Sequence, residues 1–547
     1  MSKMKKLINK VLILSVFTVS FSSCKKSFLE ETVYSSYSPQ ALKDSLGFQA
    51  SLVGLYNHFS NFQTRSDRQG WLSVWHAGTD VAYAANPEGV ETPYYKYELL
   101  NAQDAAASWT WTWAYRIINN ANLIIANVED ASLTGISENG KNAINAEARF
   151  FRGYAYNLLA TLYGRIPVIT EPLAGPKTDF TRDPLEVANT LIAEDLEFAA
   201  ANLPDVGGVG AANNAGGKPG GRANKYMAMQ VLAEAYLRMD KPGLAEQHAQ
   251  AIISSGKFGL NTTRFGSKAT QPGDPFSDMF VKGNIRRSQG NKEAIWVMEI
   301  EDRRVVPGGF TGDPQHRRVW HAAYHNVTGM KLADSLGGRG LARMHLSNWV
   351  LYGLYEETDM RNSPYNIRRR FWYNDPSKPD TYGKQVPYPL NAAGTDTVIW
   401  VGPHTTKWSQ FDPSDEFGYA MLKDITLMRL GETYLLLAEA QFEQGKLEEA
   451  ATTLNTLRAR SNASAIDASD VTLDFILDER ARELIAEENR RMTLMRTGTL
   501  VDRAIRLNSD APRNGISNLT ATHLLLPIPL SEIQLNKDAP LDQNTGY

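Results

Sequence analysis

The chain has 547 residues, 43% of them hydrophobic, which is enough to bury a large core in one or several domains. Its 57 basic and 60 acidic residues give a formal net charge of −3 at pH 7, so no overall positive field favours nucleic-acid binding. A single cysteine excludes a framework of disulfides within the chain.

The N-terminus has the three parts of an export signal. Lysines between residues 3 and 10 precede an apolar run at 11–21, and two serines then precede Cys24. The run is shorter than the ~20 residues that a membrane-spanning helix needs. The preferred interpretation is a lipoprotein signal peptide at 1–23, with Cys24 acylated as the first mature residue. Several acyl chains, at ~0.8 kcal/mol per buried methylene, would anchor the protein stably. An incidental thiol is the alternative.

Helical periodicity dominates the part of the chain that follows. Apolar residues recur at the i, i+3, i+4 and i+7 spacing of a helix with one buried face. Four stretches are predicted to be helices on this basis: 41–59, 113–130, 147–163 and 183–204. The third ends at Gly164 and Pro167, which terminate helices. In the fourth, we expect Asp183 to cap the N-terminus and Pro184 to occupy the first turn.

Two later segments, 231–253 and 436–458, resemble each other. Both contain Leu-Ala-Glu-Ala, break at a short polar turn and resume as a second stretch with helical periodicity. This pattern is typical of the helical hairpin in tetratricopeptide-type repeats, which must stack on neighbours to bury both faces.

The stretch from about 261 to 419 differs from its surroundings. It is rich in Gly, Pro, Asp, Trp and Tyr and has little helical periodicity, although residues 293–301 are predicted to form a short strand. Long irregular stretches are usually functional or disordered, and the aromatic content argues against disorder. We therefore expect a mainly α-helical scaffold at about 41–260 and 420–500, with a loop-rich insertion at 261–419.

Motifs for phosphate binding, metal binding and catalysis are weak. The Gly-rich stretch 207–225 lacks the spacing of a phosphate-binding loop and is predicted to be a flexible loop that enters a helix. His321 and His325 share helical spacing, but no cysteine or His-Glu-x-x-His motif joins them, so no metal or cofactor is predicted. Two isolated carboxylates would leave no local signature, so a hydrolase stays open as an alternative.

The segment 477–498 is rich in charged residues, with Glu479, Glu483, Glu487 and Glu488 set among arginines. Paired carboxylates are one arrangement that general acid–base catalysis uses. Their spacing instead favours (i, i+3) and (i, i+4) ion pairs along a helix, and a structural role is the preferred interpretation.

Aromatic residues outside the predicted helices are the remaining candidates for chemistry. Flat rings stack on the apolar faces of sugars, while polar side chains bind the rim of hydroxyl groups. The candidates, predicted to be exposed, are Trp71, Trp75, Tyr83, Tyr94, Tyr95, Tyr97, Trp320 and Tyr324. For any single ring, packing in the core is the alternative. Trp109, Trp111 and Trp113 adjoin a helix and are assigned to packing.

Several blocks of the chain, in this order, resemble the SusD/RagB-like lipoproteins of Bacteroidetes. They are the start at 24–31, the helical blocks 147–168, 221–237, 429–460 and 476–498, and the C-terminal block 524–547. The last is the most specific, with Pro-Ile-Pro, Ser-Glu-Ile and a final Gln-Asn-x-Gly-Tyr. One departure is Met492-Thr493-Leu494, where the family more often has an aromatic residue and Asp. That difference concerns packing rather than the choice of ligand.

The resemblance implies a tetratricopeptide-like right-handed helical bundle, one domain over 24–547, anchored by lipid to the cell outer membrane and exposed at the surface. It implies a protein that binds glycans without cleaving them and passes them to a SusC-like TonB-dependent transporter. The family's sugar sites lie on an early loop and in the long insertion. The rings that match these zones are Trp75, Tyr83, Tyr94, Tyr95, Trp320 and Tyr324. A peptide ligand, an anchored hydrolase and a pure interaction scaffold are the alternatives.

Overall fold

The computed structural model describes residues 42–547 apart from 66–68, 174 and 391–394. The predicted signal peptide and Cys24 lie outside the described residues. Within the described part of the chain, no helix is both long enough and apolar enough to cross a membrane.

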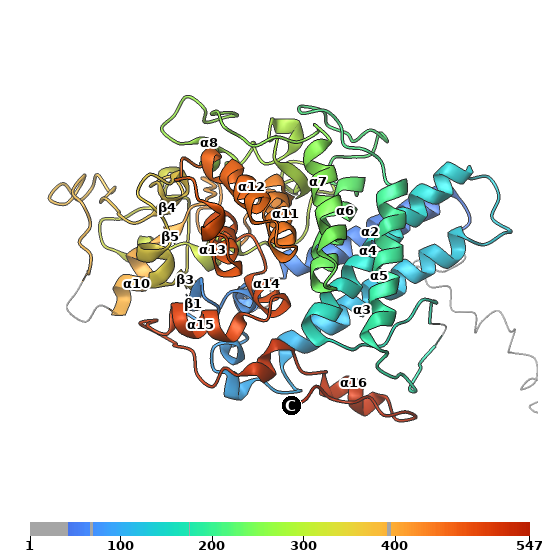
Figure 1. Cartoon of the computed structure of the whole chain (residues 1–547). Helices are drawn as coiled ribbons and strands as arrows, with labels where there is room; N and C mark the ends of the chain where they lie inside the picture. Colours follow the sequence, from blue (N-terminus) through green and yellow to red (C-terminus); the bar gives the residue numbers. More distant parts are fainter. Residues whose placement is uncertain (1–41, 66–68, 174, 391–394) are drawn as a thin grey trace, which may run out of the picture.

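Consecutive helices pack against one another in the first half of the chain (Figure 1). They are α2 (Ser45–Thr64), α3 (Ala105–Val128), α4 (Glu138–Tyr163) and α5 (Leu185–Asn202). Asp44, Asp104 and Ser137 cap the first three, because each side chain accepts backbone N–H groups that the first turn leaves unpaired. The stretches predicted at 41–59, 113–130 and 147–163 are therefore confirmed as helices.

The start of α5 differs from the prediction. The carboxylate of Asp183 accepts the backbone N–H of Val168 at 2.7 Å, and no side chain caps the helix. Pro184 lies just before the first turn rather than in it. Asp183 therefore holds the loop after α4 against the beginning of α5. Aspartate side chains near a helix end often bond to a nearby backbone N–H in this way instead of capping the helix.

Both predicted helical hairpins are present. The first consists of α6 (Lys225–Arg238) and α7 (Pro242–Ser254), and the second of α11 (Leu430–Glu443) and α12 (Leu447–Arg460). Helices α7 and α11 pack against each other, and Gln230 on α6 donates to Glu432 on α11 at 2.8 Å. Two segments that are far apart in the sequence therefore stack as neighbouring repeats do.

Shorter elements complete the described part of the chain. The short helices are α8 (Pro275–Asp278), α9 (His316–Trp320), α10 (Thr395–Val401), α13 (Leu473–Leu484), α14 (Arg490–Arg496), α15 (Leu500–Asn508) and α16 (Leu530–Leu535). Strands pair as antiparallel two-stranded ladders: β1 (Ala82–Ala84) with β3 (Met344–Leu346), β2 (Ala294–Met298) with β6 (Ile425–Arg429), and β4 (Ile367–Arg368) with β5 (His404–Thr405). β2 confirms the predicted strand.

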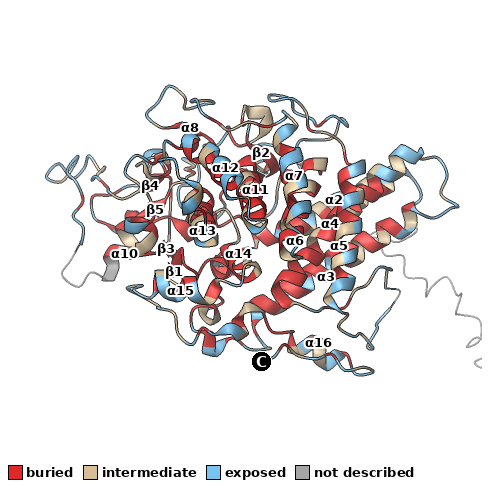
Figure 2. Cartoon of the chain, viewed as in Figure 1, coloured by how far each residue is buried: buried red, intermediate tan, exposed pale blue. Residues whose placement is uncertain are grey.

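The later part of the insertion, with β4, β5 and α10, lies to one side of the helical body (Figure 1, yellow to light orange). The segment 299–424 leaves β2 and returns through β6, where Met298 and Ile425 are direct partners in the ladder. Figure 2 shows that buried residues continue from the helices into the base of the insertion, whereas its outer loops are exposed. The insertion therefore has a packed base and an accessible rim.

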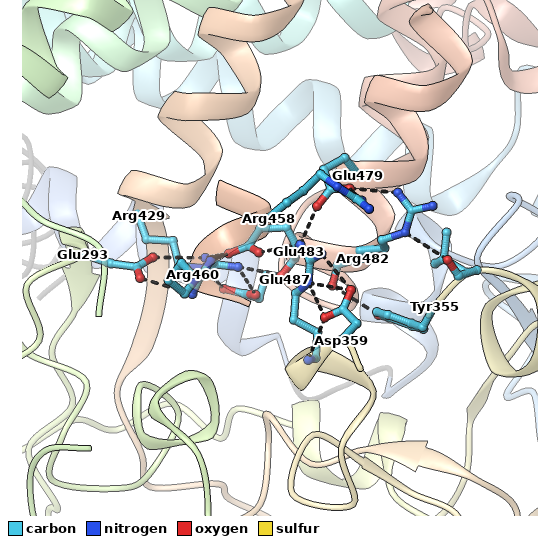
Figure 3. A network of polar contacts seen from close by, with 12 residues as sticks. Glu293, Tyr355, Asp359, Arg429, Arg458, Arg460, Glu479, Arg482, Glu483 and Glu487 are labelled. Atoms are coloured by element: carbon cyan, nitrogen blue, oxygen red, sulfur yellow. Dashed lines mark hydrogen bonds and ion pairs between the residues drawn. The ribbon is translucent and has the colours of Figure 1, made fainter. Parts of the chain in front are cut away.

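A network of buried ion pairs lies where the insertion meets the helical body (Figure 3). Arg361 in the insertion contacts Glu479 at 2.7 Å and Glu483 at 3.0 Å, both on α13. Arg429 at the end of β6 and Arg460 at the end of α12 bind the same Glu483. All five side chains are at most 3% exposed. Because a buried charge is costly without its partner, the network fixes these segments relative to one another.

The ion pairs of the segment 477–498 are mostly not the local ones expected. Glu479 and Arg482, 2.8 Å apart, have the (i, i+3) spacing. Glu483, however, binds Arg361 and Arg460, which lie 122 and 23 residues away. Burial would raise the pKa of Glu479, but Arg361, Arg482 and Arg458 outweigh it and lower the pKa to about 2. The prediction of pairs along one helix face is wrong for Glu483, because this helix is buried at a junction.

Uncharged histidines fill the interior around the insertion. The rings of His321 and His404 lie 4.7 Å apart, and both are buried. Burial lowers the pKa of His316 and His404 to about 3, and that of His76 and His345 to about 4. These rings are therefore neutral at pH 7 and serve as packing groups.

We expect Glu483→Gln to lower the free energy of unfolding by about 3–5 kcal/mol, because three buried guanidinium groups lose a shared carboxylate. Urea unfolding followed by circular dichroism measures this change. Glu448→Gln, on the exposed face of α12, is the matched control and should change the free energy by less than about 0.5 kcal/mol. Equal small effects of both variants would contradict the role assigned to the network.

We also expect the folded state to lose stability as pH falls from about 6.5 to about 4.5. Unfolded histidines bind protons near pH 6.5, whereas the folded ones stay neutral down to about 3–4, so the unfolded state binds more protons in this window. Each ring contributes up to about 1.4 kcal/mol per pH unit.

Several buried carboxyl groups oppose this trend. Burial raises the pKa of Glu432 and Glu443 to about 7, and it also raises the pKa of Asp104, Asp195, Glu299, Asp478 and Glu532, so each favours the folded state as pH falls. Among the described residues, the eight histidines whose pKa burial lowers outnumber these seven carboxyl groups. Melting temperatures measured between pH 7.5 and 4.5 show which groups dominate. His404→Asn should reduce the fall in melting temperature as the pH is lowered. A melting temperature that rises on acidification would contradict the predicted loss of stability.

Candidate functional site

The exposed aromatic rings of the described chain all lie between residues 352 and 419. They are Tyr352, Tyr365, Trp372, Tyr382, Tyr388, Phe417 and Tyr419. Exposed apolar rings that gather on one part of a surface are typical of binding sites. The helical body presents no exposed aromatic ring among its described residues, so the insertion is the aromatic face of the molecule.

The six rings predicted to contact ligand are buried, with 0–3% of their surface exposed: Trp75, Tyr83, Tyr94, Tyr95, Trp320 and Tyr324. The prediction that they are exposed is wrong, because their segments pack between the insertion and the helices. The hydroxyl of Tyr94 donates to Asp104 at 2.7 Å, and the ring of Tyr324 lies 5.8 Å from that of Phe371. The structure does not bring the six together in one site.

Tyr83 is the member of this set that lies beside exposed rings. On β1 it is the ladder partner of His345 on β3, and their rings are 5.2 Å apart. Burial raises the pKa of Tyr83, and the hydroxyl groups of Tyr388 and Tyr352 are close enough to raise it further. Tyr352 is 68% exposed and Tyr388 50% exposed. We call Tyr83, Tyr352 and Tyr388 the tyrosine cluster.

Polar and charged groups surround the tyrosine cluster. Arg513 lowers the pKa of Tyr83 and Asp510 raises it, so both charges act on the tyrosine electrostatically. Asn348 donates to Asp510 at 3.0 Å, and Arg369 donates to the carbonyl of Leu351, next to Tyr352, at 3.0 Å. Flat rings with amide, carboxylate and guanidinium groups at their edge can stack on an apolar surface and bind hydroxyl groups around it.

A second pair of exposed rings is backed by arginines. The guanidinium of Arg318 lies 4.2 Å from the ring centre of Tyr419, and that of Arg339 lies 5.4 Å from the ring centre of Phe417. Such cation–π contacts hold exposed rings in place and leave their outer faces free.

The exposed rings of the insertion were not predicted from the sequence. Tyr352 lies in the stretch 346–359, which has helical periodicity unlike the rest of the insertion, but Trp349–Gly353 forms only a single π-helical turn. Tyr388 precedes Pro389, and Phe417 and Tyr419 flank Gly418. Aromatic residues next to Pro and Gly in a loop are a usable signal, because such positions rarely enter a core.

An interior cavity of about 160 Å³ lies between the helical body and the base of the insertion. Four tryptophans line it, and two of them belong to the predicted set: Trp75, Trp296, Trp320 and Trp408. Carboxylates of Glu234 and Glu432 also line it, as does Met492 from the segment that departs from the family pattern. The cavity thus combines aromatic walls with acidic groups.

His321 and His325 do not form a metal site with other residues. His321 is fully buried against His404, and His325 lies beside Phe417, with their ring centres 6.1 Å apart. Across the described ranges, no group of three or more His, Cys, Asp or Glu residues is placed to hold a metal ion.

Comparisons with known proteins agree with this architecture. A family model described as the SusD family matches residues 351–547, and one described as starch-binding associating with outer membrane matches residues 27–237. A SusD-like protein, P25, from Formosa agariphila is 25% identical over 565 residues, which cover 97% of each chain. The chain belongs to the SusD/RagB-like family. The starch-binding protein SusD of Bacteroides thetaiotaomicron is 35% identical to this SusD-like protein over 124 residues, 23% of this chain and 22% of that one.

Solved structures show the same fold. A surface glycan-binding protein A from Bacteroides thetaiotaomicron, in complex with laminarihexaose, matches with a TM-score of 0.68 at 17% identity, covering 91% of this chain and 99% of that one. A laminarin-binding SusD-like protein matches with a TM-score of 0.65 at 21% identity, covering 92% of this chain and all of that one. The predicted mainly α-helical fold class is thereby confirmed.

Proposed function

We propose that this SusD-like protein binds a glycan on the face of the insertion, with the tyrosine cluster as a principal contact. The observation that carries the proposal is the position of the exposed aromatic rings, all of which lie between residues 352 and 419. Sugar rings pair an apolar face with a rim of hydroxyl groups, and the cluster pairs exposed rings with polar groups in the same way.

The relatives support the same class of ligand. One matching family model is described as starch-binding, and two structural neighbours bind laminarin or laminarihexaose. Binding without cleavage is part of the proposal. Release of reducing ends from a polysaccharide by the purified protein, abolished by one carboxylate substitution, would establish the hydrolase instead.

The proposed role extends to delivery. The protein, held at the outer membrane by an acylated Cys24 and exposed at the cell surface, passes its glycan to a SusC-like TonB-dependent transporter. The mature chain 24–547 acts as one unit after removal of 1–23. Support comes from the family description, which places these proteins at the outer membrane. Co-purification with a transporter from the native membrane tests the partner.

We expect Tyr352→Ala and Tyr388→Ala each to weaken glycan binding by about 1–2 kcal/mol, or roughly 5–30-fold, because each removes one exposed stacking surface. The measurement is calorimetric titration with the best glycan from a panel of plant, fungal and host polysaccharides. Tyr365→Ala is the control, since this ring is also exposed in the insertion but lies beside Arg264, away from the cluster.

Unchanged affinity in both cluster variants would refute the site. If no glycan binds, and protease but not glycosidase treatment of cell-derived ligand abolishes binding, the protein is a peptide carrier of the same fold. If it binds a transporter tightly and no small ligand at all, it is an interaction scaffold.

We expect Cys24→Ala to release the protein from the outer membrane while leaving glycan affinity unchanged, because the acyl chains supply the anchoring free energy. Fractionation of cells that lack the transporter measures attachment without a contribution from that partner. Retention of the variant in the membrane fraction of such cells would show that another segment provides the anchor.

A further inference from the structure

The interior cavity is large enough to hold a small molecule. Its volume of about 160 Å³ corresponds to about five water molecules at about 30 Å³ each. Helices α6, α11 and α14, strand β6 and residues in 59–63 and 72–76 contribute to its walls. It is separate from the tyrosine cluster, since none of the three tyrosines lines it.

The walls of the cavity carry more acidic than basic side chains. The acids are Glu234, Glu432, Glu487 and Glu488, and the bases are Arg429 and Arg480. His76 and His316 also line the cavity, but burial lowers their pKa to about 4 and about 3, so both are neutral at pH 7.

Two of the four acids are fully engaged in ion pairs. Glu487 binds Arg429 at 2.8 Å and also Lys407. Glu488 binds Arg480 at 2.7 Å and Arg490 at 2.9 Å. The charges of these two carboxylates are therefore balanced within the protein.

The other two acids are less completely paired. Glu234 makes no hydrogen bond or ion pair with any described residue. Arg238, one turn further along α6, donates to Asn157 at 3.0 Å and Asn189 at 2.8 Å and interacts with Glu234 only electrostatically. Glu432 shares Arg480, at 3.1 Å, with Glu488 and accepts a hydrogen bond from Gln230 at 2.8 Å. Neither carboxylate has a guanidinium group to itself, so both keep acceptor capacity for a further donor.

Glu234 and Glu432 both line the cavity, and each affects the pKa of other groups there. Burial raises the pKa of Glu432 to about 7, partly offset by Arg480 and reinforced by Glu234. Burial also raises the pKa of Tyr154, and both Glu234 and Glu432 add to the rise. Tyr154, Glu234 and Glu432 all line the cavity and interact electrostatically there.

Aromatic walls enclose this acidic region. The ring of Trp296 lies 6.2 Å from that of Tyr154 and stacks on Phe59 at 4.9 Å. Trp75, Trp320 and Trp408 line the remaining sides. Electron-rich ring faces attract cations, and desolvated cation–π contacts reach about 2 kcal/mol. Carboxylates with spare acceptor capacity inside an aromatic cage suit a protonated amine.

We propose that this cavity binds a small polar molecule through a protonated primary amine, which pairs with Glu234 and Glu432 within the tryptophan-lined walls. The amine belongs either to an amino sugar or to a free aliphatic amine. The site is distinct from the proposed glycan surface and does not depend on it.

Calorimetric titration of the full mature protein tests the proposal, with four probes at neutral pH: glucosamine, N-acetylglucosamine, glucose and putrescine. Glucosamine or putrescine should bind at least 10-fold more tightly than either neutral sugar. Tighter binding of glucosamine identifies an amino sugar, and tighter binding of putrescine identifies an aliphatic amine. Tryptophan fluorescence should change on binding, because four tryptophans line the cavity.

Glu234→Gln and Glu432→Gln should each weaken amine binding at least 10-fold, with melting temperatures confirming that both variants fold. Glu443→Gln is the matched control, because Glu443 lies on α11 with Glu432 and also has a pKa near 7, but does not line the cavity. The proposal is overturned if no amine binds, if neutral sugars bind equally well, or if both cavity variants keep wild-type affinity. Glycan affinity at the tyrosine cluster is measured in parallel, so the failure of either site is recognised separately.

Discussion

The shared carboxylate of Glu483 is the contact on which the arrangement of the structure depends. It accepts Arg361 from the insertion, Arg429 from the end of β6 and Arg460 from the end of α12, with almost no access to water. A buried guanidinium group without a carboxylate is costly, and these arginines also bind Asp359, Glu479, Glu293 and Glu487, so the network holds the three segments together. A loop-rich insertion with few strands thereby acquires a fixed base, which short ladders alone would not provide.

Aromatic residues in the first half of the chain are mostly buried, whereas several of those in the insertion are exposed. Those of the first half, such as Trp71 and Trp113, interlock in the core and hold the helices of the body together. Between 352 and 419, seven rings are exposed, whereas Phe371 and Trp408 are buried. Rigid placement matters for stacking, because a ring that is already ordered loses little entropy when it meets a flat ligand. Packing and the proposed recognition therefore fall to different groups of aromatic residues.

Periodic segments were predictable from the sequence, and contacts across the fold were not. The hairpins at 231–253 and 436–458 follow from local apolar spacing, which survives in the structure because both are stacked. Spacing also suggested local partners for Glu483, but its true partners lie up to 122 residues away, beyond any local pattern. Whether an aromatic ring is buried was harder to predict from the sequence. Tyr94 and Tyr95 lie in a stretch without helical periodicity, yet tertiary packing buries both rings. That Glu234 has no ion-pair partner among the described residues is likewise visible only when its neighbours are placed.

The direct pairing of Met298 with Ile425 has a consequence for variation in length. Residues 299–424 begin and end at adjacent points of one ladder, so the two ends of this segment are held together. Its exposed loops can change in length without moving the strands that hold its ends, provided that its buried contacts stay, such as the pairing of β3 with β1 and the ion pair of Arg361 with Glu479.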